Sequence, residues 1–163
     1  VVMQDGYIFS DTIERNIATA DKEINKQQLK KAVQIANIEE FVESLPLKYN
    51  TKIGAAGNGL SGGQKQRLLI ARAVYKNPHY IFFDEATSAL DAEKEKIIHD
   101  NLQQFFKGKT VLVIAHRLST VKNADQIVVL KKGEIVEIGN HQQLVQNKAE
   151  YFNLVKNQLE LGN

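Results

Sequence analysis

Residues 80–116 read YIFFDEATSALDAEKEKIIHDNLQQFFKGKTVLVIAH, and this stretch decides the fold. It begins with four bulky apolar residues, Tyr80 to Phe83, and ends with a second run without charge, Thr110 to Ala115. Short runs of this kind predict strands that are buried on both faces. Residues 92–106 lie between them and show helical spacing of apolar side chains. Strand, helix and strand predict a βαβ unit with parallel strands, and so an α/β fold with a mostly parallel sheet.

The composition fits one ordinary globular domain. The chain has 163 residues, 43% hydrophobic and 25% charged, enough for one sizeable core but not for two domains. Because it has no cysteine, a disulfide scaffold, a cysteine-ligated metal site and a thiol nucleophile are excluded. The net charge of +2, mixed along the chain, gives no electrostatic case for nucleic acid. The longest apolar run, Val111 to Ala115, has about a quarter of the length of a membrane-spanning helix.

Polar side chains follow both predicted strands at the point where each strand ends. Asp84 and Glu85 follow the first strand, and His116 follows the second. Since the carboxyl ends of parallel strands meet at the ligand-binding rim of an open sheet, we expect these side chains to lie together. Residues 1–3 are also apolar and lead to Gln4, which could reach the same rim. Helix capping by Asp84 and a strand-end role for His116 are the structural alternatives.

Two adjacent carboxylates are costly to bury after an apolar strand unless they have a use. Neighbouring side chains of an extended chain point to opposite faces, so Asp84 and Glu85 would have different partners. A magnesium ion for one and an attacking water for the other is a sensible division. The remaining histidines are expected at the surface: His79, His99 and His141.

The segment Leu60-Ser61-Gly62-Gly63-Gln64 predicts the start of a helix. Ser61 and Gln64 have the spacing of a capping box, and a capped helix with a tight entry is the simpler interpretation. Gly62 and Gly63, however, each destabilise a first turn by up to about 1 kcal/mol relative to alanine. They are useful if the backbone must approach a ligand closely. A helix start offers unpaired N–H groups and the positive end of the helix dipole, which favours an anion such as phosphate.

Most of residues 12–76 has a helical pattern, and a hairpin comes later. Asp11 and Glu14 are spaced as a capping box for a helix over Thr12–Ala18. Further elements are expected as follows: helices from Asn25 or Lys26 to Ile38 and from Ser61 to about Tyr75, a hairpin over 127–138 that turns at Gly133, and terminal helices around 141–146 and 149–161.

Taken together, these motifs resemble those of the ATP-binding cassette (ABC) ATPases, in the order typical of that family. The resemblance is carried by LSGGQ at 60–64 (the signature motif), YIFFDE at 80–85 (the Walker B strand), SALD at 88–91 (the D-loop), His116 (the switch histidine) and Gln4 (the Q-loop glutamine). It implies a P-loop NTPase-like core. Residues from about 5 to 76 would form a helical subdomain with the signature motif, and residues 77–163 an α/β core.

The resemblance also implies ATP and Mg²⁺ as cofactors and a role for each site residue. The metal would be held by Asp84 and Gln4, and Gln4 would also touch the attacking water. Glu85 would be the general base for that water. His116 would contact the γ-phosphate. The γ-phosphate of an ATP held by a second cassette would meet Ser61, Gly62, Gly63 and Gln64, and Asp91 would lie across that dimer interface.

No G-x-x-x-x-G-K-[ST] loop occurs in the sequence. That loop, called Walker A in this family, and the first strands of the sheet normally precede the Q-loop glutamine. We therefore expect the 163 residues to be the C-terminal two-thirds of a nucleotide-binding domain, and the chain by itself to be inactive.

Residues 7–18, YIFSDTIERNIA, resemble the segment that follows the Q-loop in ABC exporters, most closely those of bacterial peptides and bacteriocins. Residues 51–57 parallel a second exporter loop but carry Lys52, Ala55 and Ala56 where charged residues of another pattern are usual. An exporter implies a transmembrane-domain partner and a position on the cytoplasmic face of the bacterial inner membrane. The alternatives are a soluble ABC ATPase of the translation or DNA-repair type and a purely regulatory or dimerising module.

Overall fold

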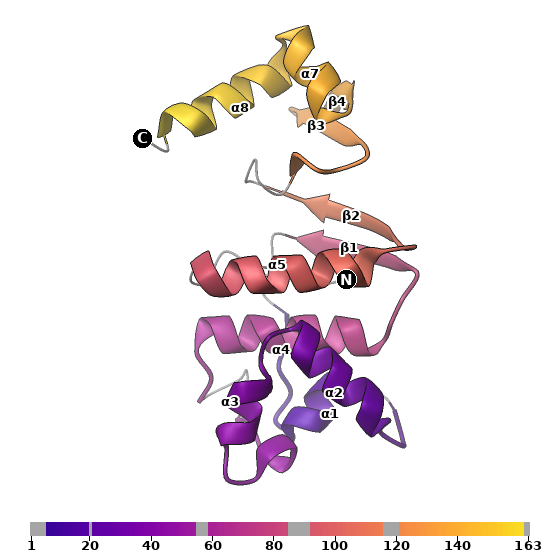
Figure 1. The fold of residues 1–163 in the computed structure, drawn as a ribbon, viewed down its shortest axis with the longest axis vertical. Helices are drawn as coiled ribbons and strands as arrows, with labels where there is room; N and C mark the ends of the chain where they lie inside the picture. Colours follow the sequence, from indigo (N-terminus) through magenta and orange to yellow (C-terminus); the bar gives the residue numbers. More distant parts are fainter. Residues whose placement is uncertain (1–5, 20, 55–58, 85–91, 116–120, 162–163) are drawn as a thin grey trace. The chain divides into compact units, whose positions relative to one another are not determined.

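The computed structural model describes residues 6–19, 21–54, 59–84, 92–115 and 121–161. The chain divides into two compact units, Val1–Ile114 and Ala115–Asn163 (Figure 1). Each unit combines helices with a pair of strands, which confirms the predicted α/β class. Among the described residues, no helix is both long and apolar enough to cross a membrane.

The first unit contains most of the helices and the parallel strand pair. Its elements are α1 (Ile13–Ile17), α2 (Lys26–Ile35), α3 (Glu39–Ser44), η1 (Lys48–Asn50), α4 (Gly62–Tyr75), β1 (Tyr80–Asp84), α5 (Ala92–Phe106) and β2 (Thr110–Ile114). The predicted βαβ unit is confirmed, since β1 and β2 pair in parallel from Tyr80↔Thr110 to Asp84↔Ile114.

One face of this strand pair is open among the described residues. Ile81 and Phe83 are buried, whereas Phe82 is 48% and Leu112 55% exposed. The prediction that both strands are buried on both faces is therefore wrong for this part of the chain. The described elements cover the side of β1 that carries Ile81 and Phe83. The apolar side chains on its other side, those of Tyr80 and Phe82, stay exposed.

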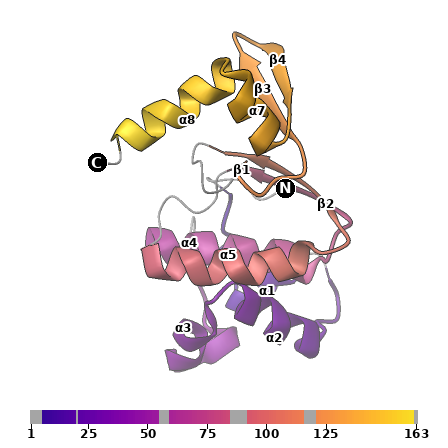
Figure 2. The same ribbon diagram turned by 45° about the horizontal axis from the view of Figure 1, so that its top comes forward.

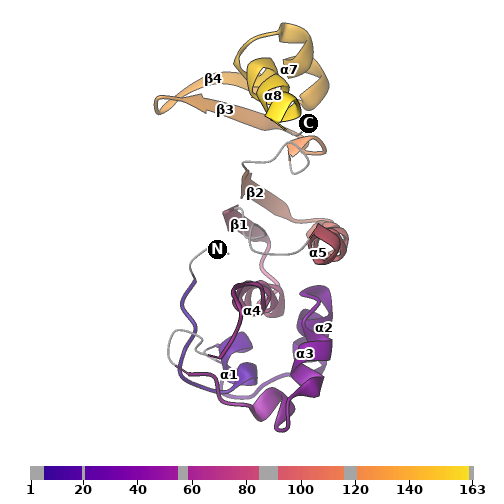
Figure 3. The ribbon, with the colours of Figure 1, turned by 90° about the vertical axis from the view of Figure 1, so that its left-hand side faces the viewer.

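Helix α4 is central to the first unit. It lies between the strand pair and helices α1, α2 and α3 (Figure 3). Leu68, Ile70 and Ala71 of α4 are almost completely buried. The same continuous core also contains Leu29, Ala32 and Val33 of α2, Ile81 and Phe83 of β1, and Ile98 and Leu102 of α5.

Helix starts follow the caps in the sequence, with one correction. Asn25 caps α2, because its Oδ1 accepts a hydrogen bond from the Gln28 backbone N–H at 3.0 Å. Helix α1 is capped by Thr12, whose Oγ1 accepts from the Arg15 N–H at 3.2 Å. The predicted Asp11–Glu14 capping box is therefore wrong, because the cap is Thr12; Asp11 Oδ1 instead accepts from the Thr12 N–H at 2.7 Å.

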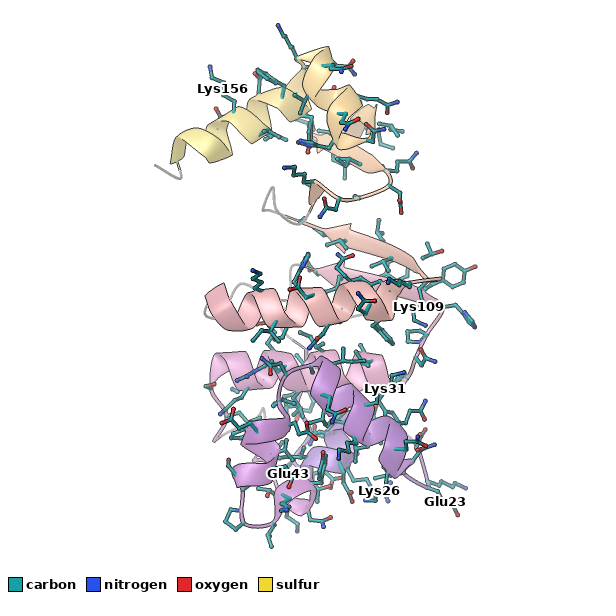
Figure 4. The ribbon with its side chains drawn as sticks, in the orientation of Figure 1. Glu23, Lys26, Lys31, Glu43, Lys109 and Lys156 are labelled. Carbon is teal, nitrogen blue, oxygen red and sulfur yellow. The ribbon has the colours of Figure 1, made fainter. Side chains whose placement is uncertain are left out.

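The amino ends of β1 and β2 are fastened at the edge opposite to the predicted site. Lys109, labelled in Figure 4, donates from Nζ to Asn77 Oδ1 at 2.9 Å. The same ammonium group lies 4.9 Å from the centre of the Phe105 ring, a cation–π contact that holds the end of α5 beside the start of β2.

The second unit is a hairpin packed on two helices (Figure 2). The hairpin and the two helices themselves were predicted. Strands β3 (Ile127–Lys131) and β4 (Glu134–Gly139) are antiparallel and precede α7 (His141–Asn147) and α8 (Glu150–Leu161). The two-residue turn has Lys132 at φ 51° and Gly133 at φ 84°. Positive φ at both positions is the type I′ turn that suits the twist of a hairpin.

His141 corrects a further prediction, since it is only partly exposed and not a plain surface residue. Its Nδ1 lies 2.8 Å from the Tyr151 hydroxyl, and the two rings are in edge contact. The Tyr151 backbone N–H donates to Glu137 Oε2 at 2.7 Å. These contacts hold α7 against α8 and α8 against β4 within the second unit.

Candidate functional site

The predicted capping box at the start of α4 is confirmed. Ser61 Oγ accepts a hydrogen bond from the Gln64 N–H at 3.2 Å, and Gln64 Oε1 accepts from the Ser61 N–H at 2.8 Å. The cap leaves the Gly62 and Gly63 amide groups, which have no intrahelical acceptor in an α-helix. Ser61 and Gly62 are exposed and Gly63 is partly exposed. The positive end of a 14-residue helix is therefore open to a ligand.

The first turn of α4 is held to α2 by Arg67. Its Nε donates to the Gly63 carbonyl at 3.2 Å, and its Nη1 donates to the Asn37 carbonyl at 2.9 Å. Asn37 has φ 50° and ends α2 in a left-handed conformation. The glycine-containing turn is thus held to α2 through the Gly63 carbonyl, while Gly62 stays exposed.

The two strand ends that carry the predicted rim residues are direct neighbours. Asp84, the last residue of β1, is partly exposed and pairs in register with Ile114, the last residue of β2. Paired strands lie about 4.8 Å apart. Glu85 comes one residue after this pair and His116 two residues after it.

Four predicted site residues lie outside the described residues: Gln4, Glu85, Asp91 and His116. Their roles stay predictions. The described members are Ser61, Gly62, Gly63 and Gln64, together at the start of α4, and Asp84 at the end of β1.

The described carboxylate at the strand end is compatible with magnesium. In the described ranges, no group of three or more acidic, histidine or cysteine side chains could enclose an ion. Magnesium keeps several waters and is usually bound by one or two carboxylates together with substrate phosphates. Asp84, a partly exposed carboxylate at a strand end, fits this kind of site.

The segment with the exporter-like sequence is hydrogen-bonded to the loop at residues 51–53. The Ile13 N–H donates to the Thr51 carbonyl at 3.0 Å, and the Ile53 N–H donates to the Asp11 carbonyl at 2.9 Å. This short antiparallel bridge joins residues 11–13 to the loop at 51–53.

Two polar residues of the first unit, Asn16 and Arg72, are not among the site residues that the sequence predicts. Asn16 is completely buried, and Arg72 is partly buried with its guanidinium directed at backbone oxygens. The available signal was an asparagine between the apolar residues Ile13 and Ile17 on the inner side of α1. Sequence spacing could not show that its partner is Arg72, 56 residues further along.

Comparison with known proteins gives the family. The family model described as "ABC transporter" matches residues 1–88, more than half of the 163 residues. The chain therefore belongs to the ABC transporter family.

Among its relatives is the leukotoxin translocation ATP-binding protein LktB of Mannheimia haemolytica, which is 48% identical over 162 residues, or 99% of this chain. LktB of Bibersteinia trehalosi is equally similar. The chain spans 23% of the length of LktB. A solved structure of a bacterial Atm1-family ABC exporter with ATP bound aligns with a TM-score of 0.90 and 39% identity, covering 96% of this chain and 27% of the exporter chain.

Proposed function

We propose that these 163 residues are the C-terminal part of the nucleotide-binding domain of an ABC exporter, in which ATP binding and hydrolysis drive export of a substrate. The second cassette of the transporter and its transmembrane domain would be the partners, at the cytoplasmic face of the membrane. The similarity to LktB and to the Atm1-family exporter supports transport over an ABC ATPase of another kind.

The parallel register of β1 and β2 is the observation on which the proposal mainly depends. It pairs Asp84 with Ile114 and so brings the two strand ends to one rim, directly before Glu85 and close before His116 in the sequence. A carboxylate pair and a histidine at the carboxyl edge of a parallel sheet would supply a metal ligand, a base and a phosphate contact.

Each site residue then has one task in the proposed hydrolysis. Asp84 and Gln4 would hold Mg²⁺, which neutralises phosphate charge when bound. Glu85 would accept a proton from the attacking water, and His116 would donate a hydrogen bond to the γ-phosphate. Ser61 and the Gly62 and Gly63 amide groups, with Gln64 in the cap, would close over the ATP of the other cassette, and Asp91 would lie across the dimer interface.

The test is the Glu85→Gln variant in the complete transporter. The substitution removes the base but keeps the shape of the side chain and an acceptor oxygen. ATP hydrolysis should fall by about 10²–10⁴-fold, while equilibrium ATP binding stays unchanged. Near-wild-type hydrolysis would show that Glu85 is not the base.

Glu134→Gln is the matched control. Glu134 begins β4 and is exposed, so the same chemical change there should leave hydrolysis at the wild-type rate. A loss in both variants would mean that the measurement responds to carboxylate removal in general.

A further inference from the structure

We propose that Arg72 and Asn16 are positioning residues that join α4 to the chain segment following Gln4, so that both respond to ATP as one body. The inference rests on the function proposed above, because it assigns a mechanical role to elements of the same site. Residues 6–17 are called the coupling segment below.

Arg72 reaches the coupling segment at three places from one side of α4. Its Nη1 donates to the Tyr7 carbonyl at 2.8 Å, and its Nε donates to the Asn16 carbonyl at 2.7 Å. Its Nη2 donates to Asn16 Oδ1 at 3.2 Å. The guanidinium carbon also lies 5.2 Å from the centre of the Phe9 ring. One side chain therefore holds both ends of the segment against the helix.

Asn16 closes the coupling segment on itself with every polar atom of its side chain. Its Oδ1 accepts from the Phe9 N–H at 2.8 Å, and its Nδ2 donates to the Phe9 carbonyl at 2.9 Å. The same Nδ2 lies 3.1 Å from the Thr12 carbonyl and 3.4 Å from the Asp11 carbonyl. Since the side chain is completely buried, these bonds are protected from water and define one conformation.

Packing alone does not explain an arginine at position 72. Burial lowers the pKa of its guanidinium, which means that the charged form is partly stripped of water. An apolar side chain would fill this space without that cost. Only a guanidinium offers several fixed N–H donors in a plane, so it can serve three carbonyl-type oxygens at once. The arrangement fixes geometry between two elements.

A close approach at Gly6 adds to the same contact. A Cβ at this position would lie 2.7 Å from the Leu69 methyl carbons, one turn before Arg72 on α4. The segment is therefore in contact with α4 from its first described residue. Gly6 follows Gln4 by two residues, a reach of at most about 7 Å.

Helix α4 carries this contact to the signature motif. Ten residues separate Gly62 from Arg72, about 15 Å along one continuous helix. A movement of the start of α4 caused by a bound anion would therefore be transmitted along the helix to Arg72, which is bonded to the coupling segment.

Hydrogen–deuterium exchange in the complete transporter tests the inference, with and without a non-hydrolysable ATP analogue. In the wild type, the analogue should slow exchange both in residues 61–66 and in the coupling segment. In Arg72→Lys, which keeps the charge but loses the fork of donors, residues 61–66 should still respond. The analogue-dependent slowing in the coupling segment should fall about fivefold or more.

Arg15→Lys is the matched control, since it makes the same chemical change inside the coupling segment, where the Arg15 Nη1 donates to the Asp21 carbonyl at 2.8 Å. It should keep the analogue-dependent response of residues 6–17. The inference is overturned if Arg72→Lys keeps that response, or if exchange in residues 6–17 rises equally with and without the analogue. If residues 61–66 of the wild type do not respond, the proposed function fails and the inference with it. If 61–66 respond and 6–17 do not, the inference alone fails.

Gly6→Ala is a milder second variant in case Arg72→Lys does not fold. Its methyl group must push Leu69 aside, which loosens the segment without touching a hydrogen bond. The analogue-dependent slowing in residues 6–17 should fall in this variant too, and an unchanged response would contradict the inference.

Discussion

Replacing Gln66 by methionine should stabilise the protein, although the residue is a polar one only two positions after the signature motif. Gln66 is 5% exposed, and its Oε1 has no hydrogen-bond partner in the described part of the chain. A buried acceptor left in this way costs about 1–3 kcal/mol. Methionine has nearly the same length and the same helix propensity, so it removes the unpaired oxygen without a new cavity.

We expect a gain of about 1–2 kcal/mol in the free energy of unfolding. For a chain of this size that gain corresponds to a rise of about 2–8 °C in the melting temperature. Urea denaturation followed by far-ultraviolet circular dichroism measures it, with an unchanged m-value as the condition that the same surface unfolds.

Gln64→Met on the same helix is the control with the opposite sign. Gln64 Oε1 accepts from the Ser61 N–H at 2.8 Å, so its loss should cost about 0.5–1.5 kcal/mol. Equal destabilisation by both substitutions would refute the reasoning, because it would mean that the Gln66 carbonyl is paired as well as the Gln64 carbonyl.

Two further predictions concern stability. Burial raises the pKa of Tyr75, so stability should be fully present below pH 10 and fall as the pH rises above the ordinary tyrosine value of about 10 toward the folded value. In Tyr75→Phe the free energy of unfolding should fall less between pH 8 and pH 11 than in the wild type. At pH 8 the variant should be less stable by about 1–2 kcal/mol, because the Asn25 N–H and Asp21 lose their hydrogen-bond partner. Gly133→Ala should lower stability by about 1 kcal/mol because of the positive φ of 84°, and not because of a clash, since a Cβ there would meet no atom within 4 Å. Gly133→Asn should lower the melting temperature less, because asparagine tolerates positive φ, and an equal loss would contradict a purely backbone effect.

The sequence predicted those features of the fold that depend on local pattern. The parallel strand pair, the helix over 92–106, the hairpin turn and the Ser61–Gln64 cap were all confirmed, because each depends on residues that are near in sequence. The Asp11–Glu14 cap was wrong by one residue. Thr12 also has a side chain that can cap, and spacing alone did not rank the two.

Long-range contacts were beyond the sequence patterns. The hydrogen bonds of Arg72 to Tyr7 and Asn16 span 65 and 56 residues, and no sequence pattern pairs residues so far apart. The exposed face of the strand pair is a second example. An apolar strand predicts that its side chains are buried, but its sequence does not indicate which element buries them. For the site, the motifs predicted both the helix start and the strand ends, and the parallel register confirmed that the two strand ends are neighbours.

The central claim is that the start of α4 closes over ATP held by another cassette. The direct measurement is the amount of ATP that stays with the complete transporter after rapid removal of free nucleotide, compared between Glu85→Gln alone and Glu85→Gln combined with Ser61→Arg. Glu85→Gln should retain ATP. The added arginine fills the space before the Gly62 and Gly63 amide groups, so the amount of ATP retained should fall about tenfold or more. Unchanged retention in the double variant would contradict the claim, because the helix start would then take no part in enclosing the nucleotide.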